Sequence, residues 1–193
     1  MTLRALLLAP PGAGKGTQGT LLAERFDVPH LATGDLLRQH VADGTELGLE
    51  AKEYMERGDL VPDALVVSLV VACIAGPQPL EGYVLDGFPR TLEQAEAAFK
   101  WGSDRGRTFH AVISLHVSEE ELVRRLLERG AAAGRVDDTE DTIRERLRIY
   151  EAKTKPLEGF YDARGILVEV DGTGEVQAVF ERIVTALTPM LDD

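Results

Sequence analysis

The chain has 193 residues, of which 44 % are hydrophobic and 28 % charged, and its formal net charge at pH 7 is −12. The acidic balance argues against a nucleic-acid or anionic-membrane surface, and no apolar run approaches the roughly 20 residues that cross a bilayer. A single cysteine, Cys73, excludes an internal disulfide and a cysteine-based zinc site. We therefore expect a cytoplasmic, globular protein with no nucleic-acid or membrane partner.

The hydrophobic pattern predicts strands that alternate with helices. Leu3–Leu8 is apolar on both faces, as expected of a central parallel strand, and a helix over 17–26 follows it. A short extended segment over 28–32 comes next. Three short helices then form a lobe rather than a simple crossover, over 33–43, 46–57 and 62–74.

The second half of the chain continues the alternation. Strands are predicted over 83–85, 111–117 and 167–170, and helices over 91–101, 118–129, 139–154 and 175–187. Thr91 with Gln94, and Ser118 with Glu121, have the spacing of capping boxes. We expect an α/β fold with a parallel sheet, helices on both faces, and ligands at the carboxyl ends of the strands.

The segment Ala9–Gln18, between the first strand and its helix, has the composition of a phosphate-binding loop. Its glycines let consecutive backbone N–H groups turn toward one centre, and the helix N-terminus that follows favours an anion. Lys15 supplies a charge for the outer phosphates of a triphosphate, and Thr17 supplies a hydroxyl near the metal position. Ala9 stands where the general pattern has its first glycine. The alternative is a glycine-rich loop that only caps a buried helix.

Two carboxylates are candidates to orient water on Mg²⁺ beside the triphosphate. Asp86 follows an apolar strand and precedes Gly87, a position that suits such a role, although a turn aspartate is the plain alternative. Asp35 is the weaker candidate, because aspartate is common in the first turn of a helix. Neither carboxylate is expected to ligate the metal directly, nor is Thr17, and all three are candidates to hold it through water.

Several arginines lie at positions where they could bind an anion. Arg38 and Arg90 follow predicted strand ends, and Arg125, Arg129, Arg135 and Arg146 surround a glycine-bordered segment over 130–138 that suits a lid. The alternative for Arg38 and Arg90 is a solvated surface arginine. For the arginines around the segment 130–138, it is a helix face of exposed ion pairs with Glu121, Glu128 and Glu145. Three others are expected to belong to exposed ion pairs, namely Arg124, Arg144 and Arg148.

Four motifs, Pro11–Gln18, Thr33–Arg38, Gly58–Asp63 and Leu85–Arg90, together resemble the signatures of the adenylate kinases, in that family's order and spacing. The resemblance covers the chain from the first strand to the last helix. It implies a P-loop NTPase-type sheet of five parallel strands in a single domain, with a core (1–32, 63–129 and 139–193), a helical NMP-binding lobe (33–62) and a short lid (130–138). The five residues between Arg129 and Arg135 resemble the short-lid form, which has no zinc-bearing domain, so no structural zinc is expected.

The resemblance also implies roles for individual residues. The ATP site would comprise Gly12, Ala13, Gly14, Lys15, Gly16, Thr17, Arg125, Arg129, Thr173 and Gly174. The AMP site would comprise Thr33, Arg38, Leu60, Val61, Gly87, Arg90, Gln94, Arg135 and Arg146. The catalytic cations would be Lys15, Arg90, Arg129, Arg135 and Arg146.

The implied activity is reversible, Mg²⁺-dependent phosphoryl transfer from ATP to AMP, giving two ADP. ATP, AMP and ADP would be the partners of a monomer. One alternative is a UMP/CMP kinase, although Thr33 stands where pyrimidine kinases usually carry alanine. The other is a nucleotide-binding switch without transferase activity, which would have no use for Arg38, Arg90 and Gln94 around a second site.

Overall fold

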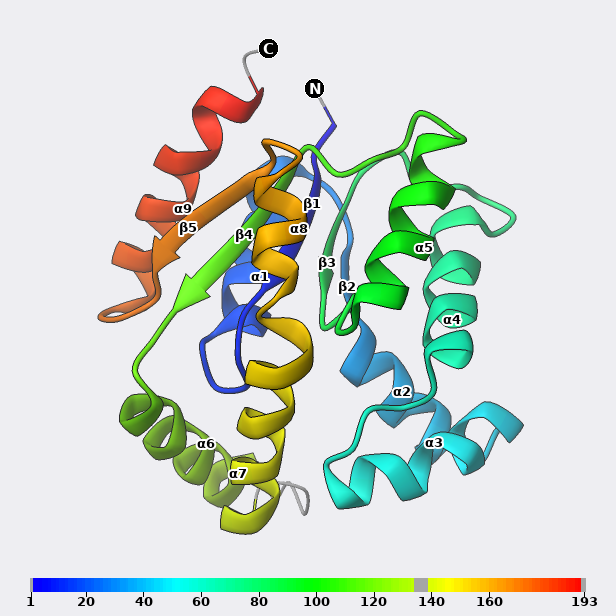
Figure 1. The fold of residues 1–193 in the computed structure, drawn as a ribbon, viewed down its shortest axis with the longest axis vertical. Helices are drawn as coiled ribbons and strands as arrows, with labels where there is room; N and C mark the ends of the chain where they lie inside the picture. The colour runs from blue at the N-terminus through cyan, green and yellow to red at the C-terminus, as the bar shows by residue number, and fades with distance from the viewer. Residues whose placement is uncertain (1, 134–138, 192–193) are drawn as a thin grey trace.

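The computed structural model describes residues 2–133 and 139–191, and it contains one parallel sheet with the strand order β2-β3-β1-β4-β5 (Figure 1). The strands are β1 (Arg4–Leu8), β2 (His30–Ala32), β3 (Tyr83–Asp86), β4 (Ala111–His116) and β5 (Leu167–Asp171). All four strand pairings are parallel. The predicted fold class is confirmed.

Helices cover both faces of the sheet. They are α1 (Lys15–Phe26), α2 (Thr33–Ala42), α3 (Glu46–Arg57), α4 (Asp63–Ala75), α5 (Leu92–Ser103), α6 (Glu119–Ala133), α7 (Glu140–Ile149), α8 (Leu157–Asp162) and α9 (Val176–Leu191). Successive side chains of β1 divide between two cores, because side chains alternate across a strand. Ala5 and Leu7 pack in the core that contains α1 and α9, whereas Leu6 and Leu8 pack in the core that contains α4, α5 and α8.

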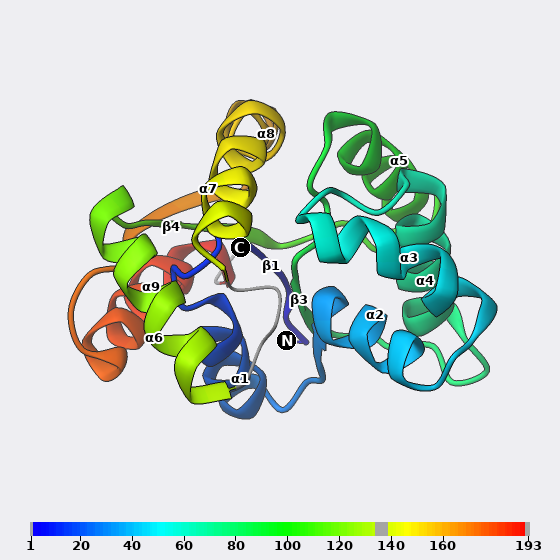
Figure 2. The same cartoon turned by 90° about the horizontal axis from the view of Figure 1, so that it is seen from below.

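The order in which the chain adds strands to the sheet reverses at β1. The chain places β3 and β2 on one side of this strand, and β4 and β5 on the other. Figure 1 shows the carboxyl ends of the strands pointing toward two groups of helices, α2 with α3 and α6 with α7, and Figure 2 shows these groups on opposite sides. A ligand in a doubly wound sheet binds at this reversal point, outside the carboxyl ends.

Some elements differ from the prediction. The helix expected over 139–154 consists of α7 and a single π-helical turn, Tyr150–Thr154, and the short helix α8 that follows was not predicted. α6 continues to Ala133, so it includes the first residues of the expected lid. α9 runs to Leu191, beyond the predicted end at Leu187. Arg135 and residues 134 and 136–138 of the lid lie outside the described residues.

Among the described residues, no helix combines the length and the apolar character needed to span a membrane.

Candidate active site

The loop between β1 and α1 has the geometry of an anion cradle. Gly12 and Gly14 adopt φ values of 86° and 95°, which favour glycine, and Gly14 directly precedes the first residue of α1. A Cβ on Gly12 would lie 2.9 Å from Leu126 Cγ, so α6 also requires a glycine there. A Cβ on Gly14 would meet no atom within 4 Å, so this part of the loop faces open space.

Ala9 fits this loop without strain. Among the described residues, the single non-glycine residue with a positive φ is Asp27, so Ala9 has an ordinary backbone conformation. Its side chain is buried in the core shared with α1. The methyl group that distinguishes Ala9 from the usual glycine therefore packs in the protein interior.

Lys15 is folded over the loop. Its Nζ donates hydrogen bonds to the carbonyl oxygens of Ala9 (2.9 Å) and Pro10 (3.0 Å). Burial lowers the pKa of Lys15 to about 8, while nearby Asp86 opposes this shift and Arg90 adds to it. The ammonium group is thus held in a place where its charge is only partly compensated, which favours an anionic ligand.

A cavity of about 400 Å³ opens above this loop. Its walls come from the β1–α1 loop, the end of β3, the start of α2, and α6 and α7. It contains the following residues predicted for the site: Gly12, Gly14, Lys15, Gly16, Thr17, Arg38, Leu60, Gly87, Arg90, Arg125, Arg129 and Arg146. The structure thus brings together cations from widely separated parts of the sequence.

A smaller cavity of about 60 Å³ shares several of these residues and extends between α2, α4 and the β3–α5 turn. It contains the following predicted residues: Thr33, Arg38, Leu60, Val61, Gly87, Arg90, Gln94 and Arg146. The arginines common to both cavities therefore lie where the anionic ends of two ligands would meet.

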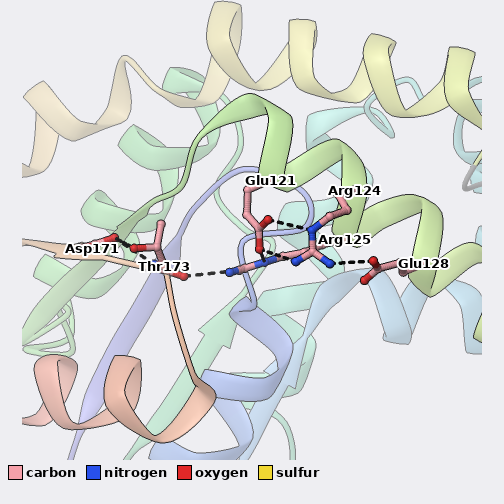
Figure 3. Close-up of polar contacts among 7 residues, drawn as sticks. Glu121, Arg124, Arg125, Glu128, Asp171 and Thr173 are labelled. Carbon is pink, nitrogen blue, oxygen red and sulfur yellow. Dashed lines mark hydrogen bonds and ion pairs between the residues drawn. The ribbon is translucent and has the colours of Figure 1, made fainter.

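Among the residues that the structure describes, three predicted site residues contribute to neither cavity. Ala13 is buried in the core and can contribute only its backbone. Thr173 and Gly174 lie in the β5–α9 turn, where Asp171 accepts hydrogen bonds from the backbone N (2.9 Å) and Oγ1 (2.6 Å) of Thr173. This turn lies beside Arg125, which places it next to the larger cavity without forming its wall (Figure 3).

The turn after β3 positions Arg90. Its Nε donates to the carbonyl oxygen of Gly87 (2.8 Å), and Thr154 Oγ1 donates to the carbonyl oxygen of Arg90 itself (2.8 Å). Gly87 has φ 80°, and a Cβ on it would lie 2.7 Å from Thr33 Oγ1. Burial lowers the pKa of Arg90, and the proximity of Arg146 lowers it further. A close pair of arginines is favourable once an anion lies between them.

Arg125 is held by two contacts (Figure 3). Its Nε donates to Glu121 Oε1 (2.7 Å), and one of its terminal nitrogens donates to the carbonyl oxygen of Gly172 (3.4 Å). Arg124 also donates to Glu121, and these two arginines hold the pKa of the Glu121 carboxyl at about 2. The expectation for Arg124, Arg144 and Arg148 is confirmed, because all three are exposed and pair with glutamates.

The candidate carboxylates differ in their surroundings. Asp86 is nearly buried, lies in the wall of the larger cavity with Thr17, and is close enough to Lys15 to oppose the lowering of its pKa. Asp35 accepts a hydrogen bond from Arg38 (2.5 Å) and is exposed. Asp86 therefore has the better position for a Mg²⁺ ion that keeps most of its water ligands.

A second group of potential metal ligands lies outside the cavity. His116, Glu158 and Glu169 each have one such atom within 4.8 Å of the others. His116 can form ion pairs with both carboxylates, at 3.8 Å and 3.3 Å, and these ion pairs account for the cluster.

Sequence reasoning missed some residues of the site. Tyr150 and Thr154, from the π-helical turn, line the larger cavity. Asp63 binds the side chain of Gln94. No motif marks Tyr150 or Thr154, whereas Asp63 stands inside the motif Gly58–Asp63 and could have been considered from it.

Comparison with known proteins agrees with this geometry. A family model described as Adenylate kinase matches residues 7–166. Curated proteins named Adenylate kinase are 50 % identical in Thermus thermophilus (182 residues, 94 % of this chain and 95 % of that protein) and 48 % identical in Mycobacteroides abscessus (185 residues, 96 % and 99 %). The protein of that name in Thermobifida fusca is 46 % identical over 185 residues (96 % and 98 %).

Proposed function

The chain belongs to the adenylate kinase family, and on this premise we propose that it transfers the terminal phosphoryl group of ATP to AMP, giving two ADP. The observation that carries the proposal is the pair of adjoining cavities that share Arg38, Arg90 and Arg146. ATP would lie in the larger cavity with its phosphates on the β1–α1 loop, and AMP would extend from that cavity into the smaller one with its base. The transferring group would then lie between them, among the shared arginines.

This reaction makes limited chemical demands on the protein. The attacking oxygen of AMP is already anionic, so the site needs neither a general base nor a covalent nucleophile. It must hold the two phosphates in line and neutralise the charge on the transferring group. The positive charge for this can come from Lys15 and from Arg90, Arg129 and Arg146. These three arginines lie close enough to Lys15 to lower its pKa, so the four cations are near one another.

Mg²⁺ would enter with ATP and reduce the negative charge of its phosphates. Thr17 and Asp86 line the larger cavity and would hold it through ordered water. Both side chains offer oxygen atoms, which suit Mg²⁺, a hard cation that keeps several of its water ligands when it binds to a protein.

The remaining predicted residues would bind the nucleotides. Arg125 would lie against the ATP base, and backbone groups of the Thr173–Gly174 turn would contact the same base. Gln94 would read the AMP base, because its amide offers both a donor and an acceptor. We further propose that the protein acts as a monomer in the cytoplasm, which rests on its composition and on the family resemblance.

A coupled assay with MgATP and each of AMP, CMP, UMP and GMP tests the proposal. We expect turnover with AMP to exceed turnover with every other acceptor by at least tenfold. Equal turnover of CMP would favour a pyrimidine nucleotide kinase, and absence of turnover with all four acceptors would favour a nucleotide-binding switch.

A further inference from the structure

We propose that Asp63 makes the AMP site selective for adenine over guanine by holding the side-chain amide of Gln94 in one orientation. The inference rests on the proposed function, because it concerns the base that the smaller cavity accepts. Asp63 does not line that cavity and would act through Gln94, as a positioning residue.

Two hydrogen bonds define the orientation of the Gln94 amide. Its Nε2 donates to Asp63 Oδ1 (2.6 Å), and its Oε1 accepts from the backbone N of Arg90 (2.8 Å). The side chain of Gln94 is almost fully buried, so water cannot readily replace either partner.

These partners cannot exchange roles. An ionised carboxylate only accepts hydrogen bonds, and a backbone N–H only donates them. Rotation of the Gln94 amide by 180° would place its NH₂ group against the N–H of Arg90 and its oxygen against the carboxylate of Asp63. Both hydrogen bonds would be lost, and two repulsive contacts would replace them.

The fixed amide still has one N–H and one acceptor site to offer, because a glutamine amide has two donors and can accept twice. Gln94 lines the smaller cavity, so these groups are available to a base bound there. The oxygen can accept from the exocyclic amino group of adenine while the nitrogen donates to adenine N1. Guanine presents the reverse pattern at these positions, an acceptor at O6 and a donor at N1–H.

Guanine would therefore pair well with the reversed amide and poorly with the observed one. Asp63 opposes the reversed amide from one side, and the Arg90 N–H opposes it from the other. Asp63 is the first residue of α4, whereas Gln94 lies in α5, so the contact also joins two helices of the AMP side.

The D63N variant tests the proposal with little change of volume. Its carboxamide can accept from the Gln94 NH₂ group or donate to the Gln94 oxygen, so one of the two obstacles to reversal is removed. We expect the ratio of kcat/KM for AMP to kcat/KM for GMP to fall about tenfold, since a lost buried hydrogen-bond partner commonly has an effect of this size. The KM for MgATP should change less than twofold.

The D63A variant should lower the same ratio, because it also removes the acceptor. The ratio is insensitive to partial unfolding, because unfolded molecules lower both kcat/KM values equally.

The matched control is the T91V variant. Thr91 Oγ1 donates to the other Asp63 oxygen (3.2 Å) and accepts from the backbone N of Gln94 (3.2 Å). Removing this hydroxyl should lower the melting temperature and leave the ratio within twofold of the unmodified protein.

The outcomes separate this inference from the proposed function. A ratio that stays within twofold in both D63N and D63A overturns the inference while AMP remains the preferred acceptor. An equal fall in T91V also overturns it, because general damage to the α4–α5 contact would then explain the effect. Lack of AMP turnover by the unmodified protein defeats both proposals.

Discussion

The lowered pKa of Lys15 predicts that the affinity for MgATP depends on pH. Burial brings this pKa from 10.5 to about 8, so the folded protein holds the proton less tightly than the unfolded chain does. The ammonium form predominates below pH 8 and the neutral amine above it. Only the ammonium form carries the charge that attracts the outer phosphates.

The size of the effect follows from a single titration. A group with a pKa of about 8 is protonated in about nine tenths of the molecules at pH 7 and in about one tenth at pH 9. Bound phosphates favour the ammonium form, so the pKa of Lys15 in the complex lies higher. We therefore expect the Kd for MgATP to rise about tenfold between pH 7 and pH 9. Between about pH 8 and pH 10.5, Lys15 is protonated more fully in the unfolded chain than in the folded protein. The nucleotide-free protein therefore becomes more stable as pH rises through this interval.

Titration calorimetry with MgATP at pH 7, 8 and 9 measures this dependence. The K15R variant keeps its charge throughout the range, so its Kd should not follow the same curve. The K15M variant should bind more weakly than the unmodified protein at pH 7 and show no such rise. A Kd that changes less than twofold in the unmodified protein, or an equal rise in K15M, would refute the assignment of the titration to Lys15.

Three substitutions test other parts of the site and the fold. R90A should raise the KM for AMP more than tenfold and leave the Kd for MgATP within twofold; an equal loss of MgATP affinity would show that the two sites are divided wrongly. E121Q should raise the KM for MgATP about threefold, because Arg125 loses a charged partner at 2.7 Å, and a matching rise in the KM for AMP would contradict this reason. G19A should lower the free energy of unfolding by about 1–3 kcal/mol, because its Cβ would lie 2.3 Å from Nε2 of the half-buried His30. Chemical denaturation measures the change, and an unchanged midpoint would show that His30 can move away.

Local patterns were sufficient to predict the elements that position the site. The apolar run Leu3–Leu8 and the glycines before Lys15 indicate a buried strand, a turn and a helix, because each depends on neighbouring residues. The structure confirms this arrangement at β1 and α1. The short helix α8 escaped prediction because its six residues are too few for a helical periodicity to be distinct.

Sequence position also identified the arginines that line the cavities: Arg38 and Arg90 stand in motifs, and Arg125, Arg129 and Arg146 flank the glycine-bordered segment. Helical spacing predicted the exposed ion pairs of Arg124, Arg144 and Arg148. Spacing could not show how each cation is held. That Lys15 Nζ binds two carbonyl oxygens of its own loop, and that its pKa falls to about 8, depends on burial and on Asp86, which is 71 positions away in the chain.

The sequence by itself thus determined the fold class, the family resemblance and most of the residues around the two cavities, because these depend on local periodicity and on ordered motifs. The tertiary structure decided which atoms of those residues remain available to a ligand. Gln94 shows the difference: its type and place in α5 follow from the sequence, whereas the orientation of its amide follows from Asp63, 31 positions earlier. Such a contact forms only when the folded backbone brings two distant segments together, and no local pattern encodes it.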